Sequence, residues 1–158
     1  MIEQEEKNRA YNGIQAHVSV CRAQQYQPGI LFDVILCNPP YFDTKKKELM
    51  NQNPYLSAAR HESYLNLEDL FITAERVLKK DGVLYLVHRY DRLAQILETA
   101  QQHHFNLERI RVVYKTIGGA QSGVLLCFGK DADQEAMTDA PVYLDDRSTF
   151  APTKGEGR

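Results

Sequence analysis

The sequence lacks the features that mark several common classes of protein. No apolar run approaches the roughly 18 residues of a membrane span, so we expect no membrane partner. The first residues are acidic and do not follow the pattern of a secretory signal. The net charge is only −2, so any footprint for nucleic acid must be a local patch rather than a basic surface overall.

Closely spaced cysteines are also absent. Cys21, Cys37 and Cys127 lie far apart, and no Cys-x-x-Cys spacing occurs. We expect them to be small buried hydrophobes in a reducing cytoplasm, which predicts a cytoplasmic protein. The five histidines supply no metal-ligand spacing, so no metal site is expected. The remaining composition, 43% hydrophobic and 25% charged over 158 residues, suits one globular domain.

One stretch changes character abruptly. Residues 32–42 read Phe-Asp-Val-Ile-Leu-Cys-Asn-Pro-Pro-Tyr-Phe. Its first six residues predict a short strand that is buried on both faces, as in a parallel sheet. Asn38 follows, and then Pro39 and Pro40 prevent both helix and continued strand pairing. Ligands of open α/β sheets bind just beyond the carboxyl ends of strands, so Asn38 is a candidate ligand-site residue. A plain turn is the other interpretation of Asn-Pro-Pro.

These residues suit a planar amino group. Asn38 Oδ1 and the Pro39 carbonyl can together accept both protons of an NH2 group. Two acceptors polarise such an amine as it pyramidalises, which helps in the transition state more than in the ground state. Tyr41 can stack on the ring that bears the amine, and Phe42 can pack beside it.

Two later stretches add candidate substrate contacts. Residues 43–64 show no clear periodicity, which is typical of a functional or a disordered loop. Within them, the lysine run is either a solvated face or a site for RNA phosphates: Lys45, Lys46 and Lys47. The triplet Arg60-His61-Glu62 either pins the loop or contacts nucleic acid. His88 and Arg89 follow a second buried strand, so they are either ligand-facing or a solvated strand end.

Periodicity and turn signals predict the remaining elements. A helix is expected over residues 67–80 with Asn66 as its N-cap, ended by Asp81-Gly82. A second helix is expected from Asp91, as cap, to about Gln102. Strands are expected at residues 17–21, 31–37, 83–87, 109–115 and 122–128, the last two joined as a hairpin through Gly118-Gly119.

The string Asn38-Pro39-Pro40-Tyr41 resembles the acceptor-site motif of amino-group methyltransferases that use S-adenosylmethionine. With Phe42, Ala59-Arg60-His61-Glu62 and Val87-His88-Arg89, the chain is similar to the bacterial tRNA adenine-N6 methyltransferases that act on the anticodon region of valine tRNA. The resemblance runs from about Lys7 to Pro152. It implies S-adenosylmethionine as cofactor and RNA, specifically tRNA, as partner.

The resemblance also implies an α/β fold, the C-terminal part of a Rossmann-like methyltransferase doubly wound sheet. In the order 3-2-1-4-5-7-6, this chain would hold strands 4-5-7-6 with strand 7 antiparallel, the N-terminal strands being missing. Residues 1–152 would form a partial class I methyltransferase domain, and 153–158 a disordered tail. Only Gly13 and Gly29 precede Asn38, so the Gly-rich turn of the family is absent. We therefore expect the chain alone to bind S-adenosylmethionine weakly or not at all.

The implied function is N-methylation of an adenine exocyclic amine in tRNA, and whether this chain is itself an enzyme is left open. The resemblance makes Asn38, Pro39 and Tyr41 catalytic, with Asn38 also on the cofactor side. The implied substrate contacts are Phe42, Lys45, Lys46, Lys47, Arg60, His61, His88 and Arg89. A protein-glutamine N-methyltransferase and a non-catalytic remnant that binds RNA or a partner chain are the alternatives.

One expectation concerns association. Strand 31–37 would be an edge strand without proline or lysine before Asn38, and therefore without the usual protection of an edge. We expect this edge to pair either with residues 17–21 or with a second copy of the chain as a homodimer.

Overall fold

The computed structural model describes residues 7, 9–13, 15–17, 19, 21–39, 65–130 and 135–145. The predictions for Tyr41, Phe42, the lysine run, Arg60, His61 and the tail 153–158 lie outside these residues. No described helix is long and apolar enough to cross a membrane.

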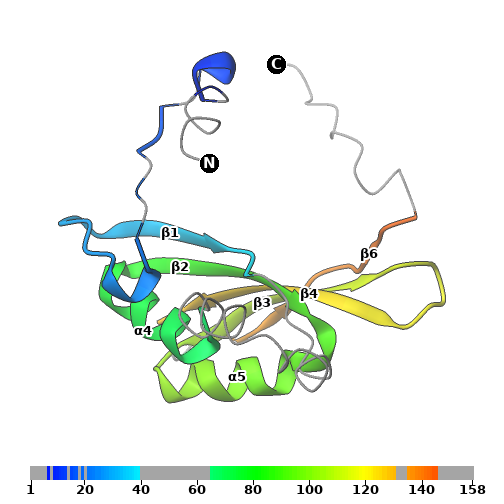
Figure 1. The fold of residues 1–158 in the computed structure, drawn as a ribbon. Helices are drawn as coiled ribbons and strands as arrows, with labels where there is room; N and C mark the ends of the chain where they lie inside the picture. Colours follow the sequence, from blue (N-terminus) through cyan, green and yellow to red (C-terminus); the bar gives the residue numbers. More distant parts are fainter. Residues whose placement is uncertain are drawn as a thin grey trace, which may run out of the picture.

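The described strands form one six-stranded sheet (Figure 1). Its order is β1-β2-β4-β3-β5, with β6 also paired to β3. β1 is parallel to β2, and β4 is antiparallel to both β2 and β3. The bounds are β1 Phe32–Cys37, β2 Leu78–Arg89, β3 Asn106–Tyr114, β4 Gln121–Gly129, β5 Met137–Thr138 and β6 Val142–Tyr143. This arrangement confirms the 4-5-7-6 order with an antiparallel strand 7.

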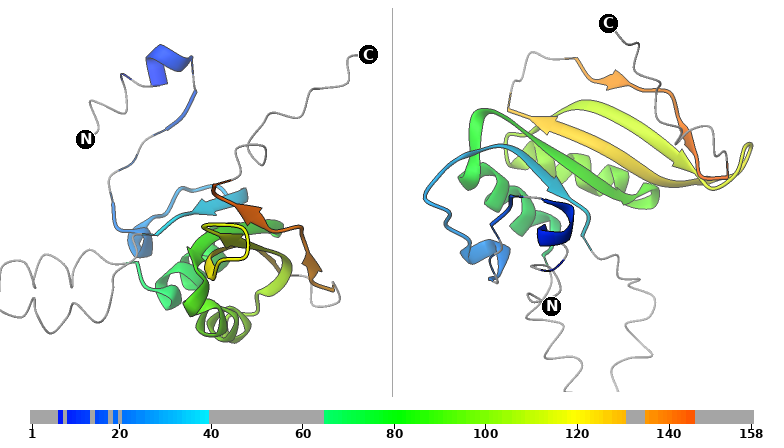
Figure 2. Two further views of the ribbon diagram at one scale, coloured as in Figure 1. Left: turned by 90° about the vertical axis from the view of Figure 1, so that its right-hand side faces the viewer. Right: turned by 90° about the horizontal axis from the view of Figure 1, so that it is seen from above.

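Two helices cover one side of this sheet, α4 (Leu67–Val77) and α5 (Leu93–Gln102) (Figures 1 and 2). α4 begins where expected, because Asn66 Oδ1 accepts a hydrogen bond of 2.7 Å from the Asp69 backbone N–H. Phe71, fully buried, sits between Phe105 and Phe128 at 5.4 Å between ring centroids. The core joins both helices to the sheet through Leu70, Phe71, Ala74, Leu84, Leu86, Ile96, Ala100, Val124, Leu126 and Phe128.

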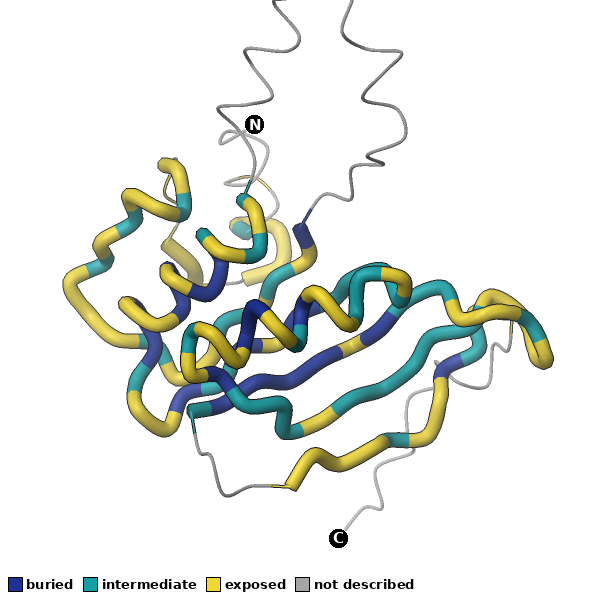
Figure 3. Tube along the Cα trace, turned by 90° about the horizontal axis from the view of Figure 1, so that it is seen from below, coloured by how far each residue is buried: buried dark blue, intermediate teal, exposed yellow. Residues whose placement is uncertain are grey.

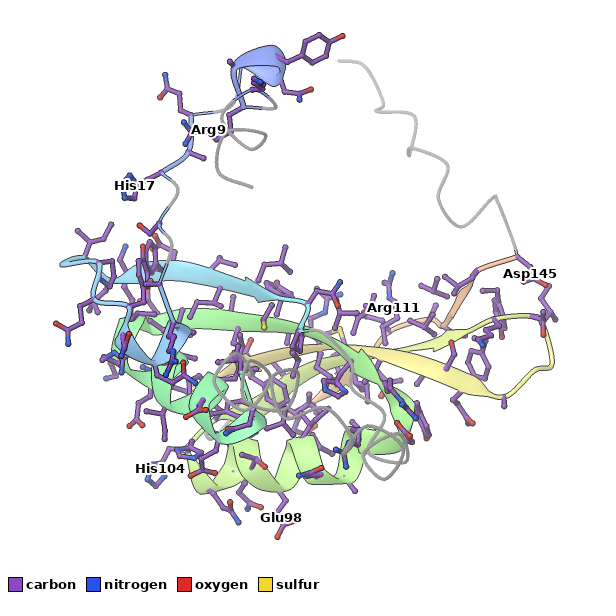
Figure 4. The ribbon with its side chains drawn as sticks, in the orientation of Figure 1. Arg9, His17, Glu98, His104, Arg111 and Asp145 are labelled. Carbon is purple, nitrogen blue, oxygen red and sulfur yellow. The ribbon has the colours of Figure 1, made fainter. Side chains whose placement is uncertain are left out.

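Neither α4 nor α5 lies on the other side of the sheet (Figure 1). Neighbouring residues of a strand point to opposite faces, so Tyr85 and Leu125 face away from the core that contains Leu84 and Leu126. Figure 4 shows Arg111 of β3 on the side of the sheet opposite to Glu98 of α5. Burial follows the same division, with buried segments along the strands that run beneath the helices (Figure 3).

The junction between α4 and β2 differs from the prediction. The helix ends at Val77, and Lys79, Lys80 and Asp81 belong to β2 rather than to a last turn and a loop. The pairing of β1 and β2 shifts here, because Phe32 pairs with Leu78 but Val34 pairs with Val83. A Cβ at Gly82 would come within 3.0 Å of the Phe32 and Asp33 carbonyl oxygens, so glycine permits this close passage.

Four other predictions were wrong. His17, Ser19 and Cys21 form no strand, since no described strand lies beside them to supply hydrogen bonds. β1 is not buried on both faces, because Ile35 and Cys37 pack against the core while Val34 and Leu36 are exposed. Asp91 caps no helix; it lies in the 3-10 turn Tyr90–Arg92 that precedes α5. Cys21 is exposed, whereas Cys127 is buried as expected.

Candidate active site

The parallel pairing of β1 and β2 brings the candidate residues of both strands to one end of the sheet. Cys37 pairs with Leu86, so Asn38 follows β1 beside the last residues of β2, which ends at Arg89. Asn38 is exposed, while Pro39 directly after it is buried. A buried proline beside an exposed amide fixes the backbone and leaves the amide side chain at the surface.

His88 lies on the core-facing side of β2, opposite Val124 of β4. Its Nδ1 accepts a hydrogen bond of 2.9 Å from the Arg89 backbone N–H. Burial lowers the pKa of His88 below its ordinary value of 6.5. The imidazole is therefore neutral at pH 7, and since Nδ1 accepts, its proton is on Nε2.

Arg89 is oriented by a neighbour that the sequence did not reveal. Its Nε donates to Asp91 Oδ1 at 3.1 Å, and a second guanidinium nitrogen donates to Asp91 Oδ2. Such a two-point contact holds the planar guanidinium in one orientation. The prediction of a helix cap concealed this role of Asp91, although the opposite charges two residues apart were a visible signal.

The described residues restrict the chemistry in two further ways. Burial raises the pKa of the Cys37 thiol, so this thiol next to Asn38 stays protonated and is a poor nucleophile. Among the described residues, no group of three or more His, Cys, Asp or Glu side chains could hold a metal ion.

The structure thus gathers four of the predicted site residues, Asn38, Pro39, His88 and Arg89, at one end of the sheet. The seven others lie outside the described residues: Tyr41, Phe42, Lys45, Lys46, Lys47, Arg60 and His61. Their roles, like those of the four, remain predictions.

The described residues do not by themselves fit S-adenosylmethionine. A glycine cradle needs glycines whose missing Cβ leaves room for a ligand against the backbone. Gly13 and Gly29 have positive φ of 63° and 71°, but each is a single glycine and neither belongs to a Gly-x-Gly turn. Gly123 and Gly129 face the protein itself, the His88 carbonyl and the Glu108 side chain. None of these four glycines forms such a cradle.

Comparison with known proteins identifies relatives of this chain. No family model matches the chain. A protein of Phocaeicola vulgatus named tRNA1(Val) (adenine(37)-N6)-methyltransferase is 30% identical over 114 residues, covering 72% of this chain and 47% of that protein. Its namesake in Bacteroides thetaiotaomicron is 32% identical over 103 residues, with 65% and 42% covered. In Aliivibrio salmonicida the identity is 29% over 91 residues, with 58% and 38% covered.

Solved structures share the fold. A predicted O-methyltransferase from Agrobacterium tumefaciens aligns with a TM-score of 0.53 at 20% identity, covering 78% of this chain and 48% of its own. An S-adenosylmethionine-dependent methyltransferase from Clostridium acetobutylicum aligns with a TM-score of 0.52 at 10% identity, covering 81% and 70%.

The chain spans less than half the length of these curated relatives. Over the part that it spans, the resemblance seen in the Asn-Pro-Pro-Tyr motif is confirmed. The chain is a homologue of proteins named tRNA1(Val) (adenine(37)-N6)-methyltransferase, and its fold is that of S-adenosylmethionine-dependent methyltransferases.

Proposed function

We propose that this chain supplies the acceptor end of an S-adenosylmethionine-dependent methyltransferase that modifies the N6 amine of an adenine in tRNA. One observation carries the proposal. The exposed Asn38 stands directly after β1 and beside the end of β2, in a chain whose homologues are named for this reaction. Ligands of open parallel sheets bind at this position.

The adenine amine is a weak nucleophile because its lone pair is conjugated with the ring. Asn38 Oδ1 and the Pro39 carbonyl accept its two protons and favour the pyramidal geometry in which that lone pair is available. A base of unusual pKa is unnecessary, because the amine loses a proton only after it has been methylated. Tyr41 stacks on the adenine ring in this proposal, with Phe42 beside it.

His88 and Arg89 suit two different parts of an RNA. His88 is neutral and stands beside Arg89 at the end of β2, so it suits a base or a ribose rather than a phosphate. Arg89 is cationic and is held in one orientation by Asp91, which suits a phosphate oxygen. The lysine run 45–47 and the pair Arg60-His61 add phosphate contacts.

A protein-glutamine substrate is not favoured, because the relatives quoted above are named for tRNA adenine. We also propose a cytoplasmic location, supported by the three free cysteines. In the absence of a partner, we propose that two chains pair through the outer edge of β1 as a homodimer. Light scattering over a range of protein concentrations tests that association.

The assay for the reaction needs a complete site. It uses a fusion of this chain with the remainder of the Phocaeicola vulgatus relative, meaning the residues outside the 114 that match. The fusion should transfer labelled methyl groups to an unmodified valine tRNA and not to the same tRNA with adenine 37 replaced by guanine. Asn38→Ala should lower single-turnover transfer by about 10²–10³-fold, the usual effect of removing one preorganised polar contact.

The matched control is Asn12→Ala, which removes another exposed asparagine far along the chain from the motif. It should leave transfer unchanged. A loss below about tenfold for Asn38→Ala would mean that Asn38 is only a turn residue. A fusion that binds tRNA without methylating it would favour the non-catalytic alternative.

A further inference from the structure

A stacked pair of tyrosines lies at the same end of the sheet as Asn38. Tyr114 is the last residue of β3 and Tyr143 is the last residue of β6. Their ring centroids are 5.3 Å apart, with an angle of 27° between the ring planes. β3 runs in the same direction as β1 and β2, because β2 and β3 are both antiparallel to β4. The strands that lead to Asn38, Arg89 and Tyr114 therefore finish at one end of the sheet.

The second tyrosine is brought to this end by a very short strand. β6 is two residues long and lies beside β3, where Val142 pairs with Val113 and Tyr143 pairs with Tyr114 (Figure 2). Val142 is buried, and the Leu144 backbone N–H donates to the Tyr114 carbonyl at 2.9 Å. Both tyrosines are only half-buried, and neither belongs to the core that joins the helices to the sheet. β6 thus holds the Tyr143 ring firmly without burying it.

The tyrosine pair lies on the side of the sheet that His88 faces. His88 pairs with Val124 and Val124 pairs with Val112, so these three residues share one face. Tyr114 is two residues beyond Val112 in β3, and side chains two apart in a strand point to the same face. Tyr143 stacks on Tyr114 from the neighbouring strand. The pair and His88 can therefore contact the same ligand.

The separation between the pair and Asn38 corresponds to several nucleotides. β1 and β3 are three strand spacings apart, which is about 14 Å. Leu125 pairs with both Val87 and Arg111, and Tyr114 lies three residues beyond Arg111, which is about 10 Å further along the sheet. The combined distance of about 17 Å equals about five nucleotides of a stacked strand. An adenine at Asn38 leaves another nucleotide of the same RNA loop within reach of the tyrosines.

The chemistry beside the pair suits a base more than a phosphate. Lys115 is the only charged residue in the turn 115–120, and the exposed Asp145 follows β6 at the same end (Figure 4). One cation beside one carboxylate gives no net positive charge to attract a phosphate. An aromatic ring face stacks on any base and needs no charge. The half-buried tyrosine rings therefore determine which part of an RNA binds here.

We propose that Tyr114 and Tyr143 form a stacking platform for an unpaired base in the RNA loop that presents the target adenine to Asn38. The base stacks on the outer face of Tyr143, and Tyr114 supports that ring from the other side. The platform fixes how the loop crosses the end of the sheet and selects RNAs that have an unpaired base at this position. That the ligand is RNA rests on the proposed function.

The test measures how tightly this chain binds a fluorescently labelled anticodon stem-loop of valine tRNA, with no methyl donor present. Tyr143→Leu should weaken binding about tenfold, because leucine offers no ring to stack on a base. Tyr143→Phe should bind like the parent chain, because stacking needs the ring and not the hydroxyl. The loss in Tyr143→Leu should be equal at low and high salt, since salt screens phosphate contacts rather than stacking.

The matched control is Tyr26→Leu. Tyr26 is also half-buried and stacks on an aromatic ring, that of Phe32 at 6.3 Å, but Phe32 begins β1 and so lies at the opposite end of the sheet. This variant should leave the RNA affinity unchanged.

A second measurement does not depend on how stable the variants are. Stem-loops that lack one loop base at a time should include one position, other than the target adenine, at which the parent chain binds about tenfold more weakly. Tyr143→Leu should be insensitive to the loss of that same base, because the partner of the base is already gone.

Equal losses in Tyr143→Leu and Tyr26→Leu, or a loss in Tyr143→Phe as large as in Tyr143→Leu, would overturn the platform. So would a series of stem-loops in which no position becomes insensitive in Tyr143→Leu, or a chain that does not bind the stem-loop. Binding that depends on Tyr143, together with a fusion that does not methylate tRNA, would overturn the proposed function and leave the platform standing. Methylation that requires Asn38, with binding indifferent to Tyr143, would do the reverse.

Discussion

The two faces of this sheet differ in how completely the chain buries their side chains. Beneath α4 and α5, side chains such as Leu84, Val124 and Phe128 are completely buried. On the face away from these helices, their strand neighbours Tyr85 and Leu125 remain more than a third exposed. The same two strands, β2 and β4, are thus packed on one side and exposed on the other. The covered face holds the buried core of the fold, whereas the other face leaves apolar side chains exposed.

The largest expected effect is a loss of stability, measured by truncating one side chain on each face of the sheet. Phe71→Ala should lower the free energy of unfolding by about 3–5 kcal/mol, because it leaves a cavity beside Phe105 and Phe128. Leu36→Ala should change it by less than about 0.5 kcal/mol, because Leu36 is 77% exposed. Urea unfolding of the isolated chain at low concentration measures both. A large cost for Leu36→Ala would mean that Leu36 is buried in solution.

A smaller effect concerns the start of α4 on the covered face. Asn66→Ala should lower the free energy of unfolding by about 1 kcal/mol, because the Asp69 backbone N–H loses its acceptor. Asn66→Asp keeps an acceptor oxygen and should cost much less. Equal losses in the two variants would show that the Asn66 side chain acts through something other than this hydrogen bond.

The third prediction concerns the protonation state of His88, which lies on the covered side of β2. Burial lowers its pKa below 6.5, so folding favours the neutral imidazole. The contribution of this group to stability is fully present above pH 6.5 and is lost as the pH falls through the lower pKa of the folded state. His88→Gln should remove that part of the pH dependence of the unfolding midpoint. An identical pH profile in both proteins would show that His88 titrates as it does in solvent.

Local signals in the sequence predicted most of the covered face. The spacing of Leu70, Phe71 and Ala74 predicted α4, and the cap at Asn66 predicted where it begins. The hairpin of β3 and β4 followed from two strand-like runs around Gly118, whose φ is 74°. The 4-5-7-6 strand order came from the resemblance carried by Asn-Pro-Pro-Tyr, not from these local patterns.

The predictions that failed concern features that depend on tertiary contacts, which local sequence patterns do not encode. The alternation at residues 17–21 satisfies the pattern of a strand, but a strand needs a neighbour, and no described strand lies beside these residues. β5 and β6 are two residues each and exist because the edge of β3 offers hydrogen bonds to them. The opposite charges of Arg89 and Asp91 are visible in the sequence, but their pairing depends on the turn geometry of Tyr90–Arg92.

The smallest expected effect on stability comes from an ion pair at the start of β1, the strand at the edge of the sheet. Lys79 Nζ donates to Asp33 Oδ1 at 2.6 Å, but the two side chains are 43% and 79% exposed. The hydrogen bond from Lys79, and then its charge, lower the pKa of Asp33 below 3.8. The pair therefore stabilises the fold above that pH, and its contribution is lost as the pH falls through the lowered pKa.

Lys79→Met should cost less than Asn66→Ala at pH 7, with a difference from the parent chain that shrinks with added salt and disappears in acid. A difference that persists in acid would mean that Lys79 acts through something other than its pair with Asp33.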